Sequence, residues 1–208
     1  MKKLLILLFS LFFLSSPSVF ADDISDFQIE GMSIGDSLLD YMTEEEILKE
    51  IEENKNTYYY LKEPYKYSEV YILKDFPTYD TVSVNIINNS PNKYVTNSNE
   101  KYSIISIRGL IKYNEDFDSC IQKRDEIVEL LSETFPNTTT YESFSAHPGD
   151  PSGDSIVDTV VFAFDSGAEI DASCNNWKES FRIKNNYSEG LSVGIMDAEV
   201  NAWIRDVQ

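Results

Sequence analysis

The 208-residue chain has a single histidine, two cysteines and few basic side chains, and each shortage excludes a class of function. His147 alone cannot form a tetrahedral zinc site, which needs several nitrogen or sulfur ligands. The 17 lysine and arginine residues stand against 36 acidic residues, which gives a formal net charge of −19. We expect such a chain to be repelled by nucleic acid and by anionic membrane surfaces.

The N-terminal segment has the pattern of a secretory signal peptide. Two lysines precede an apolar run over residues 4–14, and a short V-F-A sequence ends at Ala21. The apolar run is too short for a transmembrane helix, which needs about 20 residues, and no later run is longer. We expect cleavage after Ala21, which makes residues 1–21 the signal peptide and residues 22–208 a periplasmic or secreted chain.

The two cysteines, Cys120 and Cys174, are expected to form a disulfide, because an even pair in an oxidising compartment is typical of one. In the chain-entropy view a loop of this length stabilises the fold by about 4 kcal/mol. Cys120 lies on the apolar face of a predicted helix over 117–135, and Cys174 on the apolar face of a predicted strand over 168–174. Both side chains therefore point to the same boundary between layers.

Changes in hydrophobic period predict an α+β fold. Helical stripes are present near residues 34–41, 44–54 and 117–135, and around Val200, Trp203 and Ile204. Alternation typical of strands occupies residues 68–74, 81–87, 102–113, 140–146, 156–164, 168–174 and 190–196. The order ααβββ-αβββ-βα favours antiparallel sheets with helices packed on one face. Residues 22–208 then form a single α+β domain, with two loosely similar halves at 31–113 and 114–208.

Three segments carry a resemblance to known proteins. Residues 26–41, DFQIEGMSIGDSLLDY, resemble the opening of an uncharacterised family of small exported bacterial proteins, as do the His147 loop and the C-N-N-W sequence at 174–177. This resemblance covers most of the chain and implies no activity. The helix-helix-three-strand order also resembles, in architecture alone, small outer-membrane-assembly lipoproteins and tandem-repeat β-lactamase inhibitor proteins, which implies a binding or scaffold role.

Two short motifs place a serine where hydrolases carry their nucleophile. The G-D-S-L sequence around Ser37 matches the nucleophile block of the GDSL hydrolases, and G-M-S-I-G around Ser33 matches the G-x-S-x-G elbow. With His147 as the base, either serine gives a hydrolase hypothesis. No buried strand precedes the motifs, and Phe144 stands where GDSL hydrolases have the aspartate before the histidine. Glycines that free a turn, with Ser33 and Asp36 capping a helix, explain the same residues.

The loop after His147 has the acidic spacing of a calcium site. Asp150, Ser152, Asp154 and Asp158 match positions 1, 3, 5 and 9 of an EF-hand loop, which makes Ca²⁺ a candidate cofactor. The glycine at position 6 and the glutamate at position 12 are missing. A polar hairpin loop rich in proline and glycine is the alternative interpretation.

A tyrosine-rich stretch is the candidate binding surface, because tyrosine offers a large contact area with few rotatable bonds. It contains Tyr58, Tyr59, Tyr60, Tyr65 and Tyr67. The alternative is that these rings cover the first strand. The leading expectation is an exported, non-enzymatic protein that binds an envelope or secreted protein or acts as an envelope scaffold. The serine hydrolase and the Ca²⁺-stabilised module are the alternatives.

Overall fold

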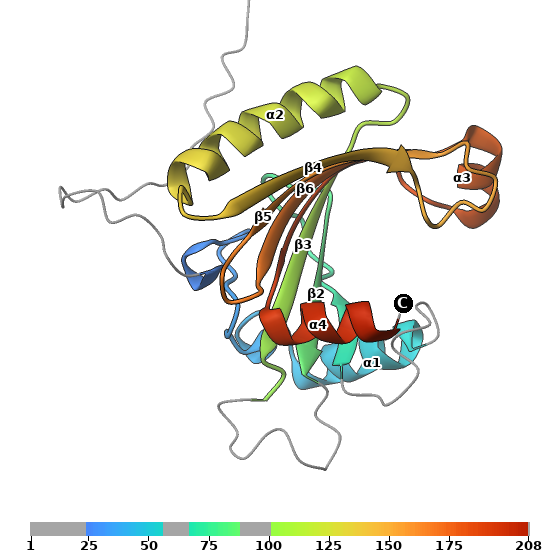
Figure 1. Cartoon of the computed structure of the whole chain (residues 1–208). Coiled ribbons are helices and arrows are strands. Elements are labelled where there is room, and N and C mark those ends of the chain that lie inside the picture. Colours follow the sequence, from blue (N-terminus) through green and yellow to red (C-terminus); the bar gives the residue numbers. More distant parts are fainter. Residues whose placement is uncertain (1–23, 56–66, 88–100, 208) are drawn as a thin grey trace, which may run out of the picture.

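The computed structural model of the chain describes residues 24–55, 67–87 and 101–207. Within these ranges seven strands form one antiparallel sheet with helices packed against it (Figure 1). The strands are β1 Tyr67–Tyr71, β2 Thr81–Ile87, β3 Ile104–Lys112, β4 Thr139–Ala146, β5 Ile156–Ala163, β6 Glu169–Asn176 and β7 Gly190–Met196. The helices are α1 Glu44–Asn54, α2 Phe117–Thr134, α3 Glu179–Asn185 and α4 Ala198–Val207. The predicted α+β class is confirmed.

The last strand of the chain lies in the middle of the sheet. The strand order is β1-β2-β3-β7-β6-β5-β4, and β7 pairs antiparallel with β3 on one side and with β6 on the other. β7 therefore joins β1, β2 and β3 to β6, β5 and β4 in one continuous sheet.

The segment before α1 is not the helix that the sequence predicts over residues 34–41. Gly35 has φ +94°, and the backbone N–H of Leu38 donates to the carbonyl oxygen of Tyr102 at 3.0 Å. Only a single 3-10 turn, Leu38–Asp40, is formed. The helix prediction is wrong because the backbone N–H groups of Gly35 and Leu38 donate to the chain that enters β3 instead of to helical partners.

Helix α1 begins with a capping box. The hydroxyl oxygen of Thr43 accepts from the backbone N–H of Glu46 at 3.3 Å, and the Glu46 carboxylate accepts from the backbone N–H of Thr43 at 2.8 Å. Ile47 is buried in the main core, and the helix packs along β1.

Helix α2 lies across one face of the sheet and is fixed there by two side-chain links (Figure 1). The predicted disulfide between Cys120 and Cys174 joins it to β6, with 6.0 Å between the two Cα atoms. Arg124, one tenth exposed, forms an ion pair with Asp158 of β5. Leu131 and Phe135, at the end of the helix, are buried in the main core. No described helix is both long and apolar enough to cross a membrane.

Helix α4 forms a smaller layer on the opposite face, whereas the sequence places the helices on one face. Val200 is buried against Tyr67 and Ile105, and the ring of Trp203 meets that of Tyr67 edge to face at 4.8 Å. These residues belong to a cluster separate from the main core. The short helix α3 has no counterpart in the sequence analysis, because it has no side-chain cap and no buried side chain.

Candidate functional site

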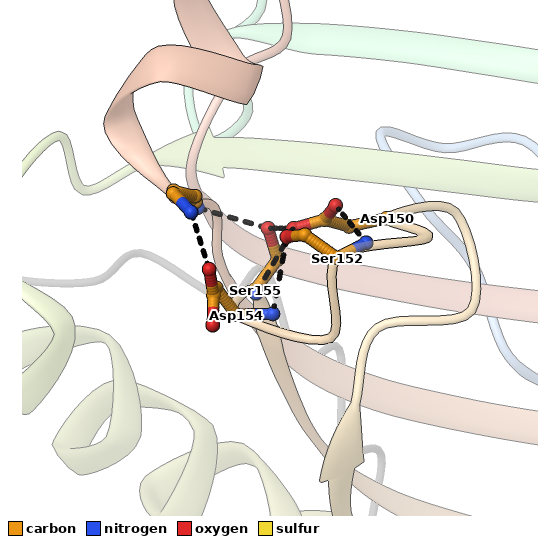
Figure 2. Close-up of polar contacts among 5 residues, drawn as sticks. Asp150, Ser152, Asp154 and Ser155 are labelled. Atoms are coloured by element: carbon orange, nitrogen blue, oxygen red, sulfur yellow. Dashed lines mark hydrogen bonds and ion pairs between the residues drawn. The ribbon is translucent and has the colours of Figure 1, made fainter.

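The loop over residues 147–155 is organised by one buried carboxylate, that of Asp150 (Figure 2). It accepts hydrogen bonds from the backbone N–H and the hydroxyl of Ser152, each at 2.9 Å. It also accepts from the backbone N–H of Ser155 at 3.1 Å and from its hydroxyl at 2.6 Å. The hydrogen bonds from Ser155, followed by those from Ser152, lower the pKa of Asp150 to about 2. Asp150 is therefore a charged anchor of the loop.

The same loop holds the start of α3. The hydroxyl oxygen of Ser155 accepts from the backbone N–H of Lys178, the residue before α3, at 2.9 Å. The ammonium group of Lys178 forms an ion pair with Asp154. Figure 2 shows Asp150, Ser152, Asp154 and Ser155 gathered in this one loop. The position of α3 therefore depends on Asp150 through Ser155.

The calcium-like spacing does not bring its four residues to one point. Asp150 and Ser152 lie together, whereas Asp154 pairs with Lys178. Asp158 lies on β5 and pairs with the arginine of α2 described above. Among the described residues, no group of three or more His, Cys, Asp and Glu side chains is arranged to hold a metal ion. Calcium binding stays a prediction to which this geometry adds no support.

The candidate serine nucleophiles lie far from His147. Ser37 forms an isolated antiparallel bridge with Ser103, beside the start of β3, and Ser33 precedes it in the same turn. The strand registers place the start of β3 at the same end of the sheet as the start of β4. His147 follows the far end of β4, so roughly 20 Å of strand separates the two sites at ~3.3 Å per residue. The structure forms no serine–histidine pair from these residues.

The tyrosine-rich surface falls largely outside the described residues, which include neither Tyr58, Tyr59, Tyr60 nor Tyr65. Tyr67 is described and is 1% exposed, with its ring against Trp203. Tyr67 therefore belongs to the packing beneath α4 and offers no contact surface to a partner.

A pocket of about 410 Å³ opens between the start of α2, the end of β6 and α3. We call it the Trp177 pocket. Tyr113, Phe117 and Trp177 give it aromatic walls, and Cys120 also lines it. Because Cys120 is bonded to Cys174, the disulfide fixes the first turn of α2 to β6 at this point. The pocket is thus built on two elements that cannot separate while the disulfide is intact.

Trp177 is the centre of an aromatic cluster. Its ring centroid lies 3.9 Å from that of His147, 4.8 Å from that of Tyr187 and 5.8 Å from that of Phe181, on which it stacks. The Nδ1 atom of His147 accepts a hydrogen bond from the backbone N–H of Gly149 at 3.0 Å. Burial lowers the pKa of His147 below its ordinary value, so the imidazole that supports Trp177 is neutral at pH 7.

A buried carboxylate and a loosely held arginine lie beside these rings. The carboxylate of Glu189, which is 6% exposed, accepts from the backbone N–H of Trp177 at 3.1 Å and of Glu115 at 3.2 Å. Arg182 lies 3.7 Å from Glu189 and 3.8 Å from the carboxylate of Glu115, beyond hydrogen-bond length. Its Nε atom has no hydrogen-bond partner among the described residues.

Two further carboxylates make the pocket negative. Asp116 caps α2 by accepting from the backbone N–H of Ser119 at 3.1 Å. Glu179, exposed in the first turn of α3, has no basic side chain within ion-pairing distance in the described chain. Four carboxylates and one guanidinium group therefore line the pocket, together with the rings of Trp177 and Phe117.

Sequence reasoning missed this pocket because its lining comes from separate stretches between residues 113 and 190. None of them has a recognisable motif, and α3 was not predicted. The closest signals were the C-N-N-W sequence and the His147 loop, both of which lie here. Comparison with protein-family models, curated proteins and solved structures finds no match to this chain. The resemblance to exported bacterial proteins remains a prediction.

Proposed function

We propose that this chain is an exported binding protein, and that its Trp177 pocket takes a ligand that presents a positively charged group. The observation that carries the proposal is the combination of ring faces with four carboxylates against one arginine in one pocket. The interaction of a cation with an aromatic face contributes about 0.5–2 kcal/mol of binding free energy, and nearby carboxylates add to that attraction. The same surroundings disfavour an anionic ligand despite the presence of Arg182.

Export is supported by the N-terminal signal-peptide pattern and by the disulfide, since disulfides persist in oxidising compartments. Binding is favoured over serine hydrolysis because Ser33 and Ser37 lie at the opposite end of the sheet from His147.

The sequence supplies its own fluorescent reporter for a test. The chain has two tryptophans, so Trp203→Phe leaves Trp177 as the only one. This variant is titrated with N-acetyl-lysine methylamide, N-acetyl-arginine methylamide and the uncharged N-acetyl-norleucine methylamide. We expect a saturable change in Trp177 emission with the two cationic probes and none with norleucine. Raising the salt concentration should weaken the effect, because the attraction is electrostatic.

The carboxylates give a matched control. Glu179→Gln should weaken the binding of the cationic probes roughly threefold, as expected for the loss of one partly exposed charge. Glu133→Gln removes the same charge from the far end of α2 and should leave binding unchanged. Equal responses to lysine and norleucine probes, or no saturable response to any probe, would contradict the proposal.

A further inference from the structure

The two edges of the sheet are built differently. At one edge, β1 has five residues, and its first four are buried beside α1 and α4. At the other edge, all eight residues of β4 are exposed. The outer backbone groups of β4 face no other described strand, because β5 is its only neighbour in the sheet. An edge of this length is open to pairing with a further strand.

The sequence of β4, T-T-Y-E-S-F-S-A, lacks the features that usually prevent such pairing. It has no lysine, proline or glycine, and its only charge is that of Glu142. Tyr141 is 57% exposed and Phe144 is 66% exposed. Phe144 lies opposite Asp158, which pairs with α2, so Phe144 is on the face that α2 covers and Tyr141 is on the other. A strand added to β4 would therefore meet an aromatic ring on each face.

We propose that β4 is a docking edge for an extended, positively charged segment of another protein, which adds to the sheet as an eighth strand. Backbone hydrogen bonds along β4 would supply affinity, and Tyr141 and Phe144 would contact alternate side chains of the added segment. The inference uses a surface separate from the Trp177 pocket and does not rest on it.

Charge identifies the occupant. Glu142 lies on the edge itself, and α2, which covers the same side of the sheet, exposes Glu129 and Glu133 (Figure 1). The net charge of −19 disfavours a second copy of the chain at this edge, because two copies repel each other. A segment with lysine or arginine at alternate positions would place its basic side chains on one face of the added strand. There they would lie near the acidic side chains around β4.

The test uses an octapeptide of alternating lysine and valine, with calorimetry on the intact protein. We expect this peptide to bind, and two matched peptides to bind at least about tenfold more weakly. In one, glutamate replaces lysine, which reverses the charge. In the other, alternate amides are N-methylated, which removes the hydrogen bonds along one edge. Slower hydrogen exchange of β4 amides on binding should locate the contact.

Substitutions on β4 complete the test. The double variant Tyr141→Lys, Phe144→Lys should bind the lysine peptide about tenfold more weakly. Leu73→Lys changes another exposed apolar residue, at 71% exposure, and should bind as the unmodified protein does.

Three results would overturn the proposal. The first is binding that neither N-methylation nor the β4 variants weaken, since the peptide would then be held at another surface. The second is equal affinity, or no affinity, for the lysine and glutamate peptides. The third is self-association of the protein in sedimentation that the β4 double variant abolishes, since the occupant would then be a second copy.

Discussion

Asp150 receives four hydrogen bonds within its own loop, and one of the donors, the Ser155 hydroxyl, also accepts from the backbone of Lys178. The sequence marks Asp150 as a metal ligand by its spacing. In the structure this spacing forms a turn instead, because Ser152 and Ser155 donate their hydroxyl and backbone N–H groups to the Asp150 carboxylate. A spacing rule identifies acidic residues in a loop, but it cannot tell which donors will satisfy them.

Low pH should remove the stabilising effect of the charged Asp150 side chain. The pKa of Asp150 is lowered to about 2 in the folded state, from about 3.9 in an unfolded chain. Its stabilising effect is therefore complete above about pH 4 and is lost as the pH falls toward 2. Asp150→Asn should lower the melting temperature at pH 7, and the difference from the unmodified protein should shrink at pH 2–3. Thermal unfolding followed by circular dichroism checks this, with the exposed Asp165→Asn as the control.

The probe assay adds a second readout for the same variant. Because Ser155 holds the start of α3, Asp150→Asn should also weaken the binding of the lysine probe to the Trp177 pocket. A stability difference that stays constant between pH 7 and pH 2.5 would argue against a charged Asp150 anchor.

At the scale of elements, hydrophobic periodicity predicts those helices and strands whose conformation depends mainly on neighbouring residues. The alternation over residues 81–87 coincides with β2, and the stripe over 117–135 matches α2 within one residue. The helix predicted over 34–41 does not form, because hydrogen-bond partners distant in sequence determine the conformation of that backbone. The Trp177 pocket is unpredictable for the same reason, since Phe117, Trp177 and Glu189 meet only after the sheet and the disulfide have formed.

The disulfide links α2 to β6 across a sequence separation of 54. The double variant Cys120→Ala, Cys174→Ala should therefore lose about 4 kcal/mol of unfolding free energy. Urea denaturation of both proteins measures the difference. Both cysteines are buried, at 1% and 0% exposure, so reductant should act slowly on the native unmodified protein and quickly once urea unfolds it. A loss below about 1 kcal/mol would show that α2 is held by packing and by the Arg124–Asp158 pair instead.

At the scale of the whole molecule, charge acts in two opposite ways. The net charge of −19 opposes compaction through self-repulsion, and salt screens that repulsion. Raising NaCl from about 10 to about 300 mM should therefore raise the melting temperature while it weakens binding of the cationic probes to the Trp177 pocket. Differential scanning calorimetry and the tryptophan titration measure the two effects on one sample. A melting temperature that falls with salt would show that the described ion pairs outweigh the global repulsion.

The central place of β7 also sets the order in which the molecule can be completed. A chain that emerges from its N-terminus makes β1 to β3 first and β4 to β6 next, but these two groups share no edge until β7 arrives. Until then β3 and β6 are two further open edges, and contacts between the groups close long loops, which is slow. β7 therefore closes the sheet only after the other described strands have formed, and until then the molecule consists of two separate, partly built sheets.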